Sequence, residues 1–339
     1  MAPRAVSALS LALVTLAATA PVSSSRGAGA DGYASGTRLG WRTHEARHFE
    51  TPLDGPCTVD RVDASQFASL EAFHDAHRAR GGAPVVVTGL APRNDAFRAM
   101  NAKEALLRRW GDETIVLSTA NTHSYRKVAK TLREYFDDHL RVQDLAVPGD
   151  ETLYWFGDND HERWAEHFAA YSPPPLIPRS ADVAYSFGVG GPLSGVPLHV
   201  HGPGFSETLI GRKRWWLAPP RPKPAFDPNA TALEWALSSR RAARAETRGR
   251  RMSDQSEALR GGGGAPTKGN GDGGVDFAAC TVAEGEAIYF PDGWWHATLN
   301  LDETVFISSF VNYARDEQGE VQGADVTGKR PDLDDAFEL

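Results

Sequence analysis

Three histidines have the spacing of a metal site. His199 and His201 lie two residues apart in Pro197-Leu-His-Val-His201, and His296 follows the turn Pro291-Asp-Gly-Trp-Trp295 much later in the chain. Alternate side chains of a strand project from one face, so the first two imidazoles should point the same way. Two histidines with this spacing more often lie on the protein surface without binding a metal. Because imidazole binds iron, zinc, copper and nickel, the third histidine makes a shared divalent metal ion the sharper interpretation.

A lysine twelve residues after His201 could hold an acidic ligand beside that metal. Lys213 lies in Gly211-Arg-Lys-Arg-Trp-Trp216, which we interpret as the next strand. The simpler interpretation is a surface lysine within a basic run. If the strand faces a barrel interior, the ammonium would instead bind a carboxylate as a point charge.

Short strands and helices must position these residues. Apolar runs between glycine, proline and polar residues predict strands at 84–89, 114–118, 152–156, 184–189, 288–290 and 305–311. Helical spacing predicts helices at 63–80, 102–110, 132–140 and 164–171. The chain should therefore be mainly β with α elements, and its histidines should lie in a run of short strands.

Two segments do not fit a packed core. Residues 240–276 are rich in Arg, Gly, Ser and Glu and have few large apolar residues, so we expect a flexible insertion between two core strands. A solvated insertion is favoured over a binding element here. Residues 315–339 are polar and acidic and should form a loose tail.

The N-terminus resembles a secretory signal peptide. Residues 1–30 contain Arg4, a run of small apolar residues and then a small polar stretch. An uncleaved anchor is the alternative. No second long apolar run follows, so no transmembrane span is expected once the signal peptide is removed. Residues 31–62 form an N-terminal segment before the main domain.

Two further features agree with a secretory address. Asn229-Ala-Thr231 is a glycosylation sequon, although such sequons often arise by chance. The two cysteines, Cys57 and Cys280, can form a disulfide in an oxidising lumen, where the alternative is two buried thiols. We expect the disulfide, which would join the N-terminal segment to the strand region before His296.

Composition narrows the class of partner. The 339 residues are 41% hydrophobic and carry a formal net charge of −8. That length suits one or two globular domains with a sizeable core. The negative charge argues against a general nucleic-acid binder. Because the N-terminus resembles a signal peptide, we expect a protein partner or substrate in the secretory pathway.

Several stretches resemble the jumonji-C (JmjC) family of iron(II)- and 2-oxoglutarate-dependent oxygenases. They are Pro84-Val-Val-Val-Thr-Gly89, Ser194-Gly-Val-Pro-Leu-His199, Gly211-Arg-Lys-Arg-Trp215 and Phe290-Pro-Asp-Gly-Trp-Trp-His296. The resemblance implies a double-stranded β-helix, the jelly-roll barrel of the cupins, over residues 63–314 with a helical and strand region at its start. It also implies a protein of the endoplasmic reticulum lumen.

The resemblance assigns roles to single residues. His199 and His296 take the first and last metal-ligand positions, and His201 stands where the family has Asp or Glu. Lys213 takes the place of the lysine that binds the far carboxylate of 2-oxoglutarate. Ser308 falls where a hydroxyl residue often helps that lysine.

Two more positions bear on the cosubstrate. Ser206 lies near an asparagine position of related enzymes, and Val196 stands where some carry a threonine that contacts the cosubstrate. A neutral His201 in place of the usual carboxylate keeps a metal site possible but changes its charge. The resemblance implies iron(II), with zinc as the alternative.

Three functions from different classes therefore stay open. The chain could be an oxygenase acting on a protein or small lumenal substrate. It could be a catalytically silent cupin that serves as an interaction module. It could also be a non-oxidative metalloprotein, for instance one loaded with zinc. Lys213 and the aromatic turn before His296 favour the first, whereas His201 and Val196 favour the second.

Overall fold

A computed structural model describes most of the chain. It covers residues 35–44, 53–79, 82–122, 124, 126–177, 182–239 and 275–312. The expected signal peptide, the expected tail and residues 240–274 of the expected insertion lie outside these ranges. Within the described ranges, no helix has both the length and the apolar character needed to cross a bilayer.

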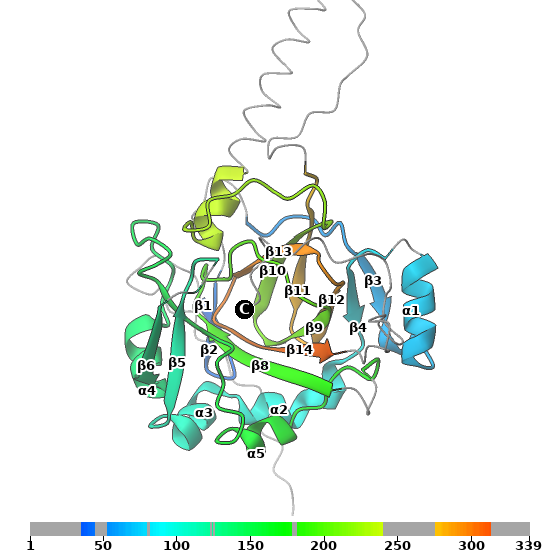
Figure 1. Cartoon of the computed structure of the whole chain (residues 1–339). Coiled ribbons are helices and arrows are strands. Elements are labelled where there is room, and N and C mark those ends of the chain that lie inside the picture. The colour runs from blue at the N-terminus through cyan, green and yellow to red at the C-terminus, as the bar shows by residue number, and fades with distance from the viewer. Residues whose placement is uncertain are drawn as a thin grey trace, which may run out of the picture.

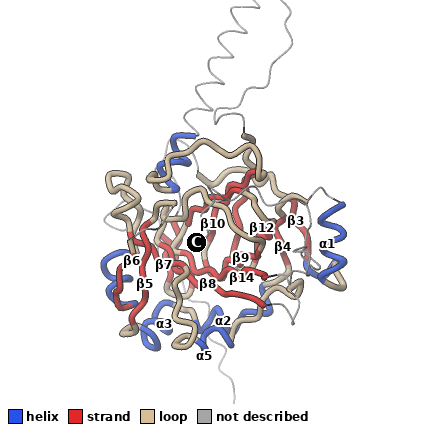
Figure 2. The backbone as a smooth tube through the Cα atoms, viewed as in Figure 1, coloured by secondary structure: helices blue, strands red, loops and turns tan. Residues whose placement is uncertain are grey.

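Two β-sheets form the body of the molecule (Figures 1 and 2). The nine strands of the larger sheet are, in spatial order, β3 (Asp60–Asp63), β4 (Val85–Thr88), β12 (Glu286–Phe290), β9 (Gly204–Ile210), β14 (Thr304–Asn312), β8 (Asp182–Gly190), β7 (Leu153–Phe156), β5 (Thr114–Thr119) and β6 (Lys127–Thr131). The smaller sheet contains β11 (Ala278–Ala283), β10 (Arg212–Ala218) and β13 (Trp295–Asn300). A hairpin of β1 (Ser35–Arg38) and β2 (Trp41–His44) precedes them. The predicted mainly β jelly-roll fold is confirmed.

The chain crosses between the two sheets at Gly211. This glycine joins β9 of the larger sheet to β10 of the smaller one with a φ of +85°, and a Cβ there would lie 2.8 Å from the carbonyl oxygen of Glu303. Only glycine fits such a position without strain. Lys213 is the second residue of β10. The interpretation of its strand as the next one after His201 was therefore wrong, because β9 lies between.

Helices lie outside both sheets, and the one at 232–239 packs against β10 and β13 of the smaller sheet. The helical elements are η1 (Ala64–Gln66), α1 (Leu70–Ala79), η2 (Ala91–Asn94), α2 (Asp95–Met100), α3 (Lys103–Trp110), α4 (Leu132–Glu134), the π-helical turn η3 (Tyr135–His139), α5 (Ala165–Ala169) and residues 232–239. Figure 1 shows α2, α3 and α5 along the side of β8. Phe97, Leu106 and Phe168 from these helices share one buried cluster with Phe187 and Ile307 of the sheet.

A single long helix over 63–80 was a wrong prediction. Asp63 accepts a hydrogen bond from the Ser65 amide and starts only the short η1. The Ser69 hydroxyl then accepts from the Ala72 amide at 3.2 Å, which caps a second helix, α1. Two capping side chains close together thus divide one apolar pattern into two elements.

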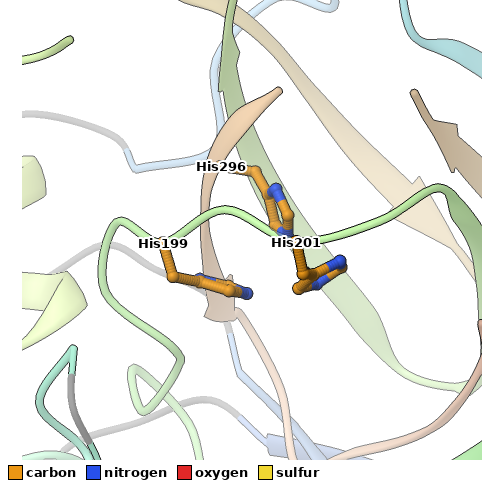
Figure 3. A group of neighbouring side chains, drawn as sticks. All are labelled: His199, His201 and His296. Carbon is orange, nitrogen blue, oxygen red and sulfur yellow. The ribbon is translucent and has the colours of Figure 1, made fainter. Parts of the chain in front are cut away.

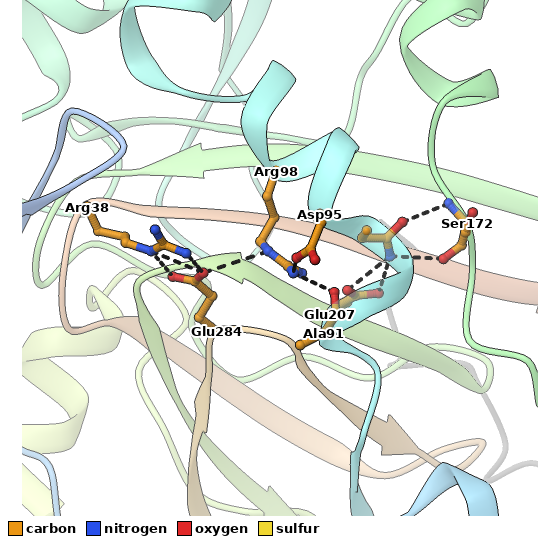
Figure 4. Close-up of polar contacts among 8 residues, drawn as sticks. Arg38, Ala91, Asp95, Arg98, Ser172, Glu207 and Glu284 are labelled. Carbon is orange, nitrogen blue, oxygen red and sulfur yellow. Dashed lines mark hydrogen bonds and ion pairs between the residues drawn. The ribbon is translucent and has the colours of Figure 1, made fainter. Parts of the chain in front are cut away.

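Polar contacts attach the first hairpin and α2 to the barrel (Figure 4). Glu284, in the turn before β12, pairs with Arg38 at 2.8 Å and with Arg98 at 3.7 Å. Glu207 of β9 is buried and accepts hydrogen bonds from the Asn94 amide at 3.1 Å. Burial raises the pKa of Glu207, and the bond from Asn94 opposes that rise. These contacts fix the outer side of the sheet that carries Ser206.

A buried histidine outside the barrel makes stability depend on pH. His167 is 1% exposed, lies among Phe97, Trp164 and Phe187, and has no hydrogen-bond partner within the described structure. Burial lowers its pKa to about 4, below its usual 6.5. Between these values only the unfolded chain binds the proton, so this contribution to stability is present at neutral pH and is lost as pH falls.

We therefore expect His167→Phe to flatten the pH dependence of unfolding. From pH 7.5 to 5.0 the free energy of unfolding of the wild type should fall by about 2 kcal/mol more than that of the variant. Urea titrations at both pH values measure this, and His161→Ala, at an exposed histidine, is the control. If the free energy of unfolding changed equally with pH in the wild type and in His167→Phe, His167 would not be the source of the pH dependence.

Candidate metal centre

Backbone hydrogen bonds place His199 opposite His296. The His199 amide donates to the His296 carbonyl at 3.0 Å, and the His296 amide donates to the His199 carbonyl at 2.9 Å. His296 lies in β13, but His199 forms only an isolated bridge and His201 lies outside any strand. Pro197 and Pro203 lack the N–H groups that would extend a ladder. The expected strand through both histidines is therefore absent, although the pairing with His296 is formed.

The three imidazoles converge on one point (Figure 3). One ring nitrogen from each of His199, His201 and His296 lies within 4.8 Å of the others. The Nε2 atoms of His201 and His296 are 3.1 Å apart. The ring centroids of His199 and His296 are 4.1 Å apart. All three nitrogens can therefore contact a single ion.

Backbone carbonyls set the tautomer of each ring. Nδ1 of each histidine lies 2.8 Å from the carbonyl oxygen of a residue one or two positions away in the chain. Those carbonyls belong to Pro197, Gly202 and Trp294. A carbonyl only accepts, so each Nδ1 carries the hydrogen, and each Nε2 has a free lone pair in the neutral ring. Two lone pairs at 3.1 Å repel each other unless a proton or a cation lies between them.

Burial keeps the imidazoles neutral. It lowers the pKa of His199 to about 3 and that of His201 to about 4. The pKa of His296 is well below its usual value, because of burial and then of its two histidine neighbours. Neutral imidazole is the form that binds metal. The donor set, its tautomers and its protonation state thus all fit a bound transition-metal ion.

Aromatic rings surround the cluster. Trp215 and Phe290 stack on the His296 ring, with centroids 5.6 and 5.2 Å away. Phe290 and Phe310 present T-shaped contacts to His201 at 5.1 and 4.9 Å. Among the described residues no carboxylate joins the cluster. The centre therefore consists of three neutral imidazole donors surrounded by aromatic side chains.

Lys213 points into the same interior. It is 2% exposed, and its Nζ donates to the Tyr154 hydroxyl at 3.2 Å. Nζ also lies 3.2 Å from the centroid of the Phe306 ring, a cation–π contact from the facing sheet. Its contacts among the described residues include no carboxylate. Burial holds the pKa of Lys213 well below its usual value.

Comparison with known proteins places the chain in a family. No family model matches it. It is 43% identical over 258 residues to JmjC domain-containing protein 8 of Mus musculus, an alignment that covers 75% of this chain and 82% of the relative. The chain belongs to the JmjC domain-containing protein 8 family. The Homo sapiens relative of the same name is 42% identical over 258 residues, with 75% of this chain and 84% of the relative covered.

A more distant JmjC protein also matches. Lysine-specific demethylase JMJ21 of Arabidopsis thaliana is 27% identical over 292 residues. That alignment covers 77% of this chain but only 26% of the plant protein. The chain is therefore a cupin-type JmjC protein with a cluster of three histidines that could hold a metal ion.

The two serines expected near the cosubstrate face the barrel interior as a pair. Ser308 of β14 lies opposite Ser206 of β9, and its hydroxyl donates to the Ser206 hydroxyl at 3.0 Å. The hydroxyl bonded to Lys213 is that of Tyr154 instead. Val196 shares a buried cluster with Tyr154 and Phe306, the two residues that contact the lysine.

Sequence reasoning missed Tyr154 and Phe306. Tyr154 and Phe156 alternate along β7, so they share a face, and both rings lie within 6 Å of Lys213 Nζ. That alternation was visible in the sequence and could have identified Tyr154. The facing position of Phe306 depends on the pairing of distant strands and was not visible.

The remaining predicted residues are not part of the three-histidine cluster. Cys57 and Cys280 are joined by a disulfide, which connects the segment before β3 to β11. Cys280 lies opposite Trp215, so the disulfide adjoins the strand that carries Lys213. Asn229 is exposed in a turn before the helix at 232–239.

Proposed function

We propose that this JmjC protein holds iron(II) with His199, His201 and His296, binds 2-oxoglutarate with Lys213, and oxidises a protein in the secretory pathway. The observation that carries the proposal is the convergence of three Nε2 lone pairs whose Nδ1 hydrogens are all held by backbone carbonyls. When bound, iron(II) supplies the redox chemistry that couples a 2-oxo acid to dioxygen.

The chain's own residues orient the reactants. Carbonyl bonds to Nδ1 keep the three rings in position, as outer-shell partners of metal ligands do. Trp215, Phe290 and Phe310 pack against the rings of His201 and His296 and limit how those rings can move. Lys213 can bind the far carboxylate of the cosubstrate, with the Tyr154 hydroxyl as a second donor.

A silent interaction module is the second candidate. His201 replaces the carboxylate ligand that usually offsets part of the metal charge. Val196 shares a buried cluster with Tyr154 and Phe306, which both contact Lys213, and it lacks the hydroxyl that a threonine would bring to a cosubstrate. The three-histidine set also suits zinc, which would give a non-oxidative metalloprotein.

The variant His201→Asp separates these functions. If the centre is an oxygenase restrained by its neutral ligand, the carboxylate should raise uncoupled 2-oxoglutarate turnover by roughly 10-fold or more. Succinate release under air, with bound iron quantified in each sample, measures the effect. His201→Asn introduces a side chain of the same shape as aspartate but without its charge, so this variant should stay at the wild-type rate. Background turnover by His201→Asp with iron bound would favour the module.

We also propose that the protein resides in the endoplasmic reticulum lumen. The signal-peptide pattern, the exposed Asn229 and the Cys57–Cys280 disulfide support this, because disulfides persist in oxidising compartments. The full chain expressed in mammalian cells should carry one glycan that endoglycosidase H removes. Asn229→Gln should migrate like the deglycosylated wild type. If the untreated wild type already migrated at the position of the deglycosylated protein, the proposal would be contradicted.

A further inference from the structure

We propose that a groove between β5 and β7 binds an extended peptide, whose backbone pairs with the open edge of β5. The floor of this groove lies on the face of the larger sheet that points away from the barrel interior. Along β7, Tyr154 contacts Lys213 in the interior, so the next residue, Trp155, projects from the opposite face. The proposal therefore does not depend on the function of the metal centre.

The groove exists because the larger sheet opens between these two strands. β5 pairs with β6 from Thr114 to Ser118, but it pairs with β7 only at Ser118 and Thr119. β7 continues for two more residues, Trp155 and Phe156, which pair with β8 on its other side. Both β5 and β7 lie near the end of the sheet opposite to β3 (Figure 2). The ladder between them is thus missing over the first part of β5.

Main-chain groups of β5 face this opening. The Thr119 amide donates to a carbonyl just before β6 at 3.1 Å, whereas the Ala120 amide donates to a carbonyl just before β7 at 2.9 Å. Successive residues of a strand direct their N–H and C=O groups to opposite edges, so Thr114 and Val116 direct theirs toward β7, as Ala120 does. Within the described ranges neither of these two residues has a pairing partner in β7. An extended chain can pair with such an edge.

Aromatic side chains form a cavity beside this edge. Its volume is about 320 Å³, and buried Ile115, Trp155 and Trp164 belong to its lining. The centroids of the two indole rings are 5.4 Å apart. The Trp155 indole N–H is buried and has no hydrogen-bond partner among the described residues. A buried donor without an acceptor is costly, so a peptide carbonyl that reached it would be stabilised.

A fixed loop forms the other wall of the groove. The Asn159 side-chain oxygen accepts from the Phe187 amide at 2.8 Å, and its side-chain nitrogen donates to the Phe187 carbonyl at 3.2 Å. Asp160 accepts from the Arg163 amide at 3.0 Å. These bonds hold the wall in position without a ligand. Binding would therefore cost little in ordering the loop.

Charges at the rim favour a basic peptide over an acidic one. Three carboxylates and two cations form ion pairs there, Asp158 with Lys127, and Asp160 and Glu113 with Arg163. One carboxylate is in excess, so a cation on the peptide complements the rim. We therefore expect a segment with alternate apolar side chains, one of which packs on the tryptophan floor, and with lysine or arginine at its ends.

A synthetic octapeptide tests the pairing. It has a lysine at each end, alternating valine and threonine between them, and blocked termini. We expect it to shift the indole N–H signals of Trp155 and Trp164 in NMR spectra of the full-length protein. It should also slow hydrogen exchange at Thr114 and Val116, because it covers their amides. No shift of either indole signal at millimolar peptide would overturn the proposal.

A matched peptide separates backbone pairing from contact by side chains alone. The same octapeptide with every central amide N-methylated cannot donate to a strand edge, so it should bind roughly 10-fold more weakly or worse. Equal binding by the two peptides would overturn the proposal. This comparison uses the wild-type protein, so it does not depend on the folding of any variant.

Two variants at Thr114 test the open edge itself. Proline is tolerated at the first residue of a strand, so Thr114→Pro removes one N–H that faces the groove and should weaken peptide binding by roughly 3- to 10-fold. Thr114→Val keeps the N–H and should bind like the wild type. Wild-type affinity in a folded Thr114→Pro would overturn the proposal. Indole shifts caused by N-acetylglucosamine but not by the octapeptide would also overturn it, because they would indicate a carbohydrate site.

Discussion

His199→Ala should reduce the affinity for cobalt(II) or zinc(II) by at least about 100-fold. Removing one of three donors takes away a large share of the roughly 10–16 kcal/mol that structural zinc sites supply with four ligands. His199 has no substitute nearby, since no other side chain among the described residues joins the cluster. Equilibrium dialysis with metal analysis measures the loss.

A matched variant excludes a general effect of losing a histidine. His161 is exposed and lies outside the cluster, so His161→Ala should bind metal like the wild type. Circular dichroism should show that both variants are folded. If His199→Ala retained wild-type affinity, the metal would have to bind elsewhere in the chain.

Cys57→Ser should lower the free energy of unfolding by about 5 kcal/mol in the chain-entropy model. The disulfide closes a loop with a sequence separation of 223 residues, so its loss frees a very long segment of the unfolded chain. Cys57 is exposed whereas Cys280 is fully buried, so changing Cys57 leaves the core packing intact. Urea unfolding of the oxidised protein gives the difference.

Reduction provides the control for this experiment. Wild type unfolded in the presence of dithiothreitol should match Cys57→Ser, and the reductant should not affect the variant. A midpoint shared by the oxidised wild type and Cys57→Ser would show that the bridge contributes nothing to stability.

Local sequence patterns predicted the histidine cluster but not the backbone pairing that positions it. The spacing of His199 and His201 and the turn before His296 identify three donors from sequence alone, because each signal lies within a few residues. The site does not depend on a strand through both of the first two histidines. It depends on a single bridge, since proline on each side interrupts the backbone ladder.

The residues that surround Lys213 could not be predicted from local sequence patterns. Tyr154, Phe306 and Val196 come from three separate segments that meet only when β10 faces the larger sheet. β9 was also missed as a separate strand, because Gly204–Ile210 is buried on both faces and lacks the alternation that identifies half-buried strands. Tertiary pairing, not propensity, decides these features.

The location of a bound metal ion tests the central claim most directly. A crystal structure of the protein grown with cobalt(II) or zinc(II), with the ion identified by anomalous scattering, should show one ion among His199, His201 and His296. Its distances to the three Nε2 atoms should be about 2.0–2.2 Å, while each Nδ1 remains bonded to its carbonyl. An ion bound elsewhere, or coordinated by Nδ1 at any of the three, would contradict the account.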